Sequence, residues 1–257
     1  MGISYRVCTS NEEYDTVQKL EMTVWNMPSA DDAITAHMMH IVTHTGGIVM
    51  GAFDGDRMIG LAVGLATKFP GRLWSHMAGV HPDYQGQGIG YDIKQFQREW
   101  AIKQGYTEMR WTFDPAMRRN AHFNFHLLGA TTNSYHENFY GVMKDGINAG
   151  VPSDRFEVVW QLEADKKSSH EIPSELRFLL HENNRKPVII ENRSERYYAV
   201  MCPYDFPALK AENLDLAVQW RQAMREVLQS AFDSGYHVVD FVADRDSKKS
   251  YYVLHRR

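Results

Sequence analysis

Residues 79–90 constrain the fold of this chain more than any other segment. They read Gly-Val-His-Pro-Asp-Tyr-Gln-Gly-Gln-Gly-Ile-Gly and stand between two patterned elements, a predicted strand over 73–80 and a predicted helix over about 89–104. The loop glycines are Gly86, Gly88 and Gly90. They let the backbone turn tightly and let a ligand approach it without a Cβ atom in the way. Because the first N–H groups of a helix lack partners within it and carry the positive end of its dipole, this unit is predicted to bind phosphate or pyrophosphate.

The spacing of these glycines excludes two common phosphate motifs. They fall at alternate positions, which is not the Gly-x-Gly-x-x-Gly of dinucleotide-binding folds. No Lys-Ser or Lys-Thr pair follows them, as a P-loop requires. An isolated glycine pair would more often be a simple connection, but here the glycines belong to a longer pattern.

Hydrophobic patterning around the loop predicts an α/β fold, with a mixed, mostly antiparallel central sheet flanked by helices. Before the loop we expect a short strand, two helices and three consecutive strands, at 3–8, 10–25, 31–44, 48–53, 58–69 and 73–80. An Asp-Gly hairpin turn at 54–57 joins the first two of these consecutive strands. After the loop helix we expect a strand, a helix and two strands, at 107–113, 115–128, 131–140 and 156–162.

The remaining residues, 163–257, predict a ββαββ extension, with a boundary in the polar segment that contains Ser168 and Ser169. Its strands are expected at 187–192, 197–201, 236–243 and 251–255, and its helix at 208–233. The helix ends at Gly-Tyr before a strand, as the loop helix does, so a degenerate half repeat of the first domain is one hypothesis. We therefore expect domains at 1–162 and 163–257.

The pattern around the loop resembles motif A of the GNAT N-acetyltransferase superfamily. In that family a strand with valine leads to proline, an aromatic residue and then Gln/Arg-x-x-Gly-x-Gly/Ala; here Gln85, Gly88 and Gly90 stand at the defining positions. The predicted order of elements is also similar to a GNAT fold over about residues 3–162. The resemblance implies an acyl-CoA-dependent N-acyltransferase that transfers the acyl group directly to an amine.

The resemblance also implies how the coenzyme is held. The loop would bind the pyrophosphate of acyl-CoA through Gln85, Gly86, Gln87, Gly88, Ile89 and Gly90. The preceding strand would diverge from its neighbour, so that Met77, Gly79 and Val80 pair with the pantetheine arm. A backbone N–H there would polarise the thioester carbonyl.

His76 is the predicted catalytic base, because arylalkylamine-type GNAT members carry a histidine at this offset before the loop. An imidazole titrates near pH 6.5, which suits the removal of a proton from an amine. A glutamate or ordered water in that role, or a histidine that is only hydrogen bonded within the sheet, are the alternatives.

The general acid departs from the family pattern. The position that often holds a tyrosine is Phe125, which cannot donate a proton. Tyr140 is the preferred substitute, with Tyr135 and His126 as alternatives, and direct release of the thiolate to solvent is another. The alternative for Tyr140 is a purely structural role, as an aromatic side chain that packs within a strand.

Further residues are assigned to the coenzyme or the acceptor. Asn120 matches an asparagine that family members place near the coenzyme, and Asn124 lies one turn later on the predicted helix. Asp114, Arg118 and Trp25 are the predicted acceptor-binding residues. A helix N-cap is the alternative for Asp114, and a role in the core or on the surface is the alternative for Trp25 and for Glu21, which shares its helix face.

Composition limits the partners. The chain has 28 Lys and Arg against 32 Asp and Glu, a net charge of -4, so we expect no nucleic acid partner. No apolar run approaches the ~20 residues that cross a bilayer, so we expect no membrane partner. Two cysteines among 257 residues fit a reducing, cytoplasmic location. Three histidines at helical spacing (37, 40 and 44) lack acidic or cysteine ligands nearby, so we expect no metal.

Three sequence segments outside motif A resemble a bacterial GNAT subgroup that includes amino-acid N-succinyltransferases. These segments are residues 75–77, 111–115 and 148–155. This implies a small-molecule amine or amino acid as acceptor, and either acetyl-CoA or succinyl-CoA as donor. The alternative from a different class is a non-catalytic acyl-CoA-binding or sensing module, which Phe125 favours. A further option is that residues 163–257 serve as an interaction or dimerisation region, which would make the protein a homodimer.

Overall fold

The computed structural model describes residues 2–141, 150–164, 171–191 and 194–256. The chain forms two compact units, the first made of residues 1–111 and 161–163 and the second of 112–160 and 164–257. Residues 112–160 therefore group with the carboxyl-terminal part, whereas the sequence alone placed a boundary at 162. Most of the loop expected after Tyr140 lies outside the described residues.

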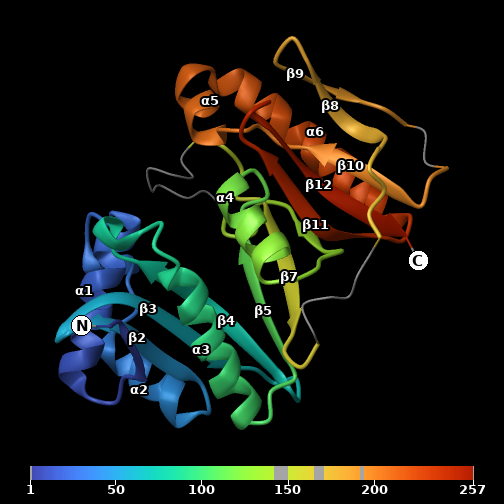
Figure 1. The fold of residues 1–257 in the computed structure, drawn as a ribbon. Helices are drawn as coiled ribbons and strands as arrows, with labels where there is room; N and C mark the ends of the chain where they lie inside the picture. The colour runs from blue at the N-terminus through green and yellow to red at the C-terminus, as the bar shows by residue number, and fades with distance from the viewer. Residues whose placement is uncertain (1, 142–149, 165–170, 192–193, 257) are drawn as a thin grey trace. The chain divides into compact units, whose positions relative to one another are not determined.

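The first unit is built on a sheet with the strand order β1-β2-β3-β4-β5 (Figure 1). The strands are β1 (Ser4–Val7), β2 (Ile48–Asp54), β3 (Arg57–Ala66), β4 (Arg72–Val80) and β5 (Glu108–Phe113). β1 to β4 are joined antiparallel, and β5 runs parallel to β4. The Asp-Gly turn joins β2 to β3 as predicted, with Gly55 at a positive φ of 57°.

Helices cover both faces of this sheet (Figure 1). α1 (Asn11–Trp25) and α2 (Ala36–His44) bury an apolar cluster on one face, which includes Val17, Leu20, Met39, Leu61 and Val63. α3 (Ile89–Lys103) covers the other face, where its Ile93 lies against Gly60 of β3. The first helix begins as expected, since Ser10 and Glu13 form a reciprocal capping box.

The helix predicted over 31–44 is shorter than expected. A 3₁₀ turn, η1 (Ala30–Asp32), is followed by extended backbone at Ala33, and Thr35 then caps α2 by accepting a hydrogen bond from the N–H of Met38. The Ile34 N–H donates to Glu21 of α1, so this segment is held by α1 and does not continue a helix.

The second unit carries a five-stranded sheet with the order β11-β12-β10-β8-β9 (Figure 1). Its strands are β8 (Phe178–Asn183), β9 (Lys186–Ile189), β10 (Tyr197–Met201), β11 (Tyr236–Asp244) and β12 (Lys249–Arg256). The helices α5 (Phe206–Glu212) and α6 (Leu214–Asp233) belong to this unit, and α6 packs along the sheet. β6 (Tyr135–His136) pairs antiparallel with β7 (Arg155–Gln161).

Four elements of the second unit differ from the sequence prediction. The helix expected over 115–128 is a short α4 (Arg118–Ala121) that continues as a π-helix, η3 (His122–Leu127). The strand expected over 131–140 is reduced to β6 and isolated bridges. β8 was missed, because its short apolar run lies in a polar stretch. The helix expected over 208–233 is divided at Asn213, whose extended backbone and side-chain cap start α6.

The α/β class, with a mostly antiparallel sheet flanked by helices, is confirmed. The carboxyl-terminal extension has the element order βββααββ in place of ββαββ. The strand–loop–helix unit lies wholly within the first unit.

Candidate active site

The glycine-rich loop joins β4 to α3 through a short 3₁₀ turn, η2 (Pro82–Tyr84). Gly86 and Gly88 have positive φ values of 80° and 84°. A Cβ atom at either position would meet nothing within 4 Å, so these glycines are needed for the backbone conformation and leave open space beside it. α3 begins at Gly88 without a side-chain cap. The N-terminus of α3 is thus exposed beside an open loop, which suits an anion.

The strands that precede and follow α3 are β4 and β5, and they are paired along only part of β4. The parallel ladder with β5 joins only Arg72–Trp74 to Glu108–Arg110, whereas β4 continues to Val80. β4 stays paired with β3 from Leu73 to Val80, except at His76. The predicted divergence of this strand is therefore present, and it begins at Ser75, directly before His76.

His76 occupies an irregular position on β4. Met77 pairs with Val63 and Ser75 pairs with Gly64, so His76 is the extra residue of a β-bulge. Bulges redirect side chains and often lie beside active sites. The side chain of His76 keeps contact with solvent, while desolvation by surrounding protein lowers its pKa below the usual 6.5. At neutral pH the imidazole is therefore uncharged and able to accept a proton.

The α1 side of β4 holds the predicted acceptor residue Trp25. A Cβ atom at Gly79 would lie 2.8 Å from Val24 Cγ1 and 3.0 Å from the Trp25 ring, so the last turn of α1 lies directly on β4. Met77 packs against the same apolar cluster, together with Val24 and Trp25. Gly79 is thus required by this close approach.

Lys94 and Glu21 of the first unit are buried, and neither forms an ion pair with any residue that the structure describes. Lys94 of α3 donates hydrogen bonds from Nζ to Ser75 Oγ at 2.8 Å and Gln97 Oε1 at 3.2 Å, and burial lowers its pKa to about 7. Glu21 of α1 accepts a hydrogen bond of 3.1 Å from the Ile34 N–H, and burial raises its pKa to about 7. Sequence reasoning named Glu21 without assigning it chemistry and missed Lys94, since neither stands in a motif.

In the second unit, Asp114 is engaged by a buried arginine. Its carboxylate accepts hydrogen bonds of 2.5 and 2.7 Å from Arg221, which is only 1% exposed, and one of 2.8 Å from the Ala116 N–H. The charge of Asp114 is therefore balanced within the protein.

The other predicted residues of this unit lie in different environments. Arg118 donates a hydrogen bond of 2.7 Å to the Tyr204 carbonyl, and its guanidinium lies 3.9 Å from the centroid of the Tyr204 ring. Asn120 of α4 is exposed, whereas Asn124 of the π-helix is buried. The two asparagines therefore differ in their exposure to solvent.

Phe125 and Tyr140 also lie in the second unit. Phe125 is buried in an aromatic cluster with Phe113, Phe156 and Tyr252. Tyr140 stands in a turn, is 48% exposed, and its hydroxyl lies 3.0 Å from Thr112 Oγ1. Tyr140 thus keeps a hydroxyl at the surface of its unit, while Phe125 is a core residue.

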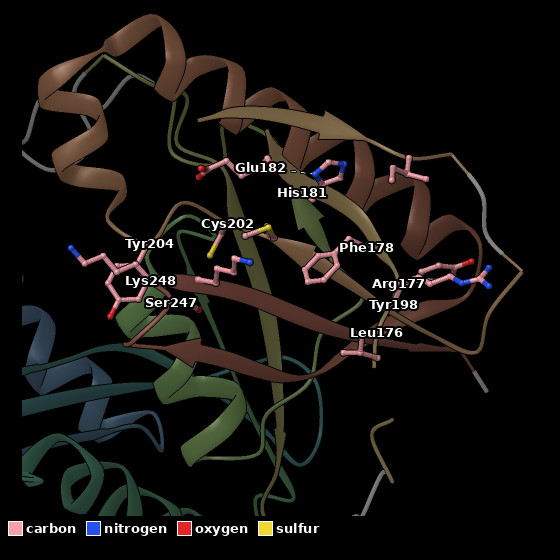
Figure 2. Close-up of a pocket in the computed structure, with 13 residues that line it drawn as sticks. Leu176, Arg177, Phe178, His181, Glu182, Tyr198, Cys202, Tyr204, Ser247 and Lys248 are labelled. Carbon is pink, nitrogen blue, oxygen red and sulfur yellow. Dashed lines mark hydrogen bonds between the residues drawn. The ribbon is translucent and has the colours of Figure 1, made fainter. Parts of the chain in front are cut away.

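A separate pocket of about 700 Å³ opens in the second unit (Figure 2). Figure 2 shows Phe178, His181, Cys202 and Tyr204 among the residues around it. None of the predicted site residues lines it. Burial raises the pKa of Cys202 to about 12, so this cysteine is not a reactive thiolate. We assign no step of acyl transfer to this pocket.

Searches of the described residues find no cluster of three metal-ligating side chains. Within the same residues, no helix combines the length and apolar character needed to cross a membrane.

Comparisons with known proteins agree with this geometry. The model of the acetyltransferase (GNAT) family matches residues 12–129, which include α1, the bulge at His76 and the glycine-rich loop. A search of curated protein sequences finds no match.

Solved structures show the same fold over about two thirds of the chain. The ribosomal-protein-S18-alanine N-acetyltransferase from Escherichia coli aligns with a TM-score of 0.51 at 11% identity, covering 65% of this chain and 98% of that one. The protein yncA from Salmonella typhimurium, solved with its cofactor acetyl-CoA, aligns with a TM-score of 0.51 at 16% identity, covering 64% and 96%. The aminoglycoside 6'-acetyltransferase type Ii aligns with a TM-score of 0.50 at 14% identity, covering 64% and 99%.

The fold is therefore the GNAT fold, and residues 12–129, somewhat under half of the chain, match the model of the acetyltransferase (GNAT) family.

Proposed function

We propose that the protein uses acyl-CoA to acylate the amine of a small molecule by direct transfer. The observation that carries this proposal is the end of the β4–β5 ladder at Trp74, six residues before β4 ends at Val80 and leads into the glycine-rich loop. An extended arm that pairs with the free edge of β4 would have its phosphates at the α3 N-terminus. The pyrophosphate and pantetheine of coenzyme A meet that requirement.

The backbone and His76 take the chemical roles. A backbone N–H between Met77 and Val80 donates to the thioester oxygen and stabilises negative charge as it develops there. His76, uncharged at neutral pH, accepts a proton from the attacking amine. Its place in the bulge beside Met77 supports this assignment.

Tyr140 is the proposed proton donor to the leaving thiolate. Its hydroxyl is exposed on the second unit, and Phe125 offers none. Tyr140→Phe tests this role: a fall in kcat with unchanged coenzyme affinity supports it. An unchanged kcat assigns protonation of the thiolate to solvent.

The acyl group is acetyl or succinyl, and the acceptor is a small amine or amino acid. The test is release of free thiol from acetyl-CoA and succinyl-CoA against a panel of amines and D- and L-amino acids. Coenzyme binding is measured in parallel. Acceptor-dependent release identifies both substrates, whereas tight binding without release over the whole panel supports a sensing module instead.

A further inference from the structure

The five-stranded sheet of the second unit carries the pocket of about 700 Å³ (Figure 2). Pockets that hold small molecules commonly enclose about 300–1,000 Å³, so this one is of sufficient size. All of its lining residues fall within 176–249, beyond the end of the family match at residue 129. A ligand bound here would therefore belong to the carboxyl-terminal part of the chain and not to the glycine-rich loop.

The alternation of side chains along β12 places the pocket on one face of the sheet. Tyr252 points into the aromatic core, where its ring centroid lies 4.8 Å from that of Phe241. Because neighbouring residues of a strand point to opposite faces, Lys249 and Tyr251 point to the other face. There the Tyr251 ring packs edge-on against Phe178, and both Phe178 and Lys249 line the pocket.

The lining includes a group of apolar side chains and a fixed aromatic ring. Phe178 comes from β8, Met201 from β10, and Ile190 follows β9. Ile190 is 43% exposed, so an apolar group that covered it would be favoured by the burial of its surface. Tyr204 is held by Arg118, which donates a hydrogen bond to its carbonyl and lies 3.9 Å from its ring centroid.

The charged lining has an excess of positive charge, since it consists of Arg177, Lys248, Lys249 and Glu182. Arg177 is already ion paired, with Nη1 3.0 Å from Oε1 of Glu195. Neither Lys248 nor Lys249 forms an ion pair with any residue that the structure describes. Figure 2 shows Lys248 and Arg177 toward opposite ends of the pocket. The uncompensated positive charge therefore lies at the end formed by the β11–β12 turn.

Asp244, which stands opposite Lys249 in the register of β11 and β12, is engaged within that turn. Its carboxylate accepts hydrogen bonds of 2.6 Å from Ser247 Oγ and 2.9 Å from the Asp246 N–H. These hydrogen bonds lower its pKa, and the charge of Lys249 adds to the effect. The two side chains interact without an ion pair, so the ammonium of Lys249 stays available to a ligand.

Lys248 has a backbone conformation that favours glycine. Its φ is 51°, in the left-handed region, where a Cβ atom crowds the neighbouring carbonyl oxygen. Glycine would take this conformation at a lower conformational energy. Unfavourable backbone conformations are often found at ligand sites, where the surrounding structure maintains them. A side chain that binds a ligand would explain why lysine stands here.

We propose that this pocket binds a small organic acid. Its carboxylate lies between the ammonium groups of Lys248 and Lys249, and its apolar body lies along Phe178, Met201 and Ile190. The apolar lining favours a carboxylate with a hydrocarbon body over inorganic phosphate, which would leave that lining uncovered. The proposal does not depend on acyl transfer, so the two can fail separately.

The test is a titration of the full chain, without coenzyme, followed through the NMR signals of the added probe. The probes are phenylacetate and isocaproate, which carry an aromatic and a branched apolar body. Phenylacetamide and isocaproamide are neutral probes of the same shape, and inorganic phosphate supplies negative charge alone. We expect both carboxylates to bind, each amide to bind at least about tenfold more weakly, and phosphate not to bind.

Three variants locate the site. Lys249→Gln removes one ammonium and should raise the Kd of both carboxylates about tenfold. Lys248→Gly should raise the Kd as much, while its Tm should not fall, because glycine favours the left-handed conformation. Lys186→Gln is the matched control, since Lys186 is an exposed lysine of β9 that does not line the pocket. It should bind like the wild type.

Three results would overturn the proposal. The first is that neither carboxylate binds to the wild type. The second is that the amides bind as tightly as the carboxylates, which would show an apolar pocket without an anion site. The third is that Lys249→Gln and Lys248→Gly both bind like Lys186→Gln, which would place the carboxylates elsewhere. If the Tm of Lys248→Gly falls, Lys249→Gln decides, because it leaves the backbone of the turn unchanged. Thiol release from acyl-CoA, measured separately, tests the proposed function alone.

Discussion

The Nζ atom of Lys94 donates a 2.8 Å hydrogen bond to the Oγ atom of Ser75, which ties the second turn of α3 to β4 at the point where β4 leaves β5. The same ammonium lies 3.9 Å from the centroid of the Trp111 ring on β5. Lys94 thus contacts both strands where they begin to diverge. No carboxylate in the described part of the chain pairs with it, and burial lowers its pKa to about 7.

Lys94→Met should stabilise the protein at and below neutral pH, by on the order of 1–2 kcal/mol. Removal of the cation leaves Ser75 Oγ hydrogen bonded to Gln97 Oε1 at 2.9 Å, so no new unsatisfied group is created there. The lysine has a pKa of about 7 when folded and an ordinary one of 10.5. Its destabilising effect is complete below pH 7 and disappears as pH rises through 10.5. The gain in the free energy of unfolding should therefore fall between pH 7 and pH 10.

Urea unfolding at pH 6.5 and pH 10 checks this expectation. Lys103→Met is the control, since Lys103 is exposed near the end of the same helix. A Lys94→Met protein that is less stable than the wild type at pH 6.5 would show that the hydrogen bonds and the Trp111 contact outweigh the burial of charge.

Gly88→Ala should weaken coenzyme binding, and Gly105→Ala should not. Both glycines have a φ of 84°, and a Cβ atom at either would meet nothing within 4 Å. The two substitutions therefore impose the same backbone strain, about 1–2 kcal/mol, at opposite ends of α3. Only Gly88 lies in the loop that is proposed to hold the pyrophosphate.

Titration calorimetry with coenzyme A measures the difference. We expect Kd to rise at least about tenfold for Gly88→Ala and to stay near the wild-type value for Gly105→Ala. Equal affinities for the two variants would place the phosphates elsewhere.

The loop was predictable because its information is local. Glycine spacing, the proline and the flanking periodicity specify a strand, a turn and a helix N-terminus without reference to distant residues. The bulge at His76 was not predictable, since it exists only in the register between β4 and β3. The buried states of Glu21 and Lys94 likewise depend on which helix covers which face of the sheet. The π-helix at His122–Leu127 was likewise not predictable from the α-helical spacing of Asn120 and Asn124.

His76→Gln should lower kcat by about 10²-fold while coenzyme affinity is kept. Glutamine preserves polar volume but cannot accept the proton of the amine. Because burial lowers the pKa of His76, the wild-type rate should retain an acid limb below pH 6.5 that the variant lacks.

Stopped-flow measurement of thiol release over pH 5–9 checks this prediction, with the exposed His44→Gln as the control. An unchanged rate at every pH would remove His76 from the reaction and leave a glutamate or ordered water as the base.

Asp114→Asn should destabilise the second unit rather than alter acceptor affinity. The substitution leaves Arg221, 1% exposed, without the carboxylate that accepts its two short hydrogen bonds. Loss of one partner from a buried ion pair costs about 3–5 kcal/mol, because the remaining charge is neither solvated nor compensated. The double variant Asp114→Asn/Arg221→Met removes both charges and should recover most of the lost Tm. If Asp114 instead binds the acceptor, Asp114→Asn will raise the KM for the acceptor with little change in Tm. The double variant will then not restore KM.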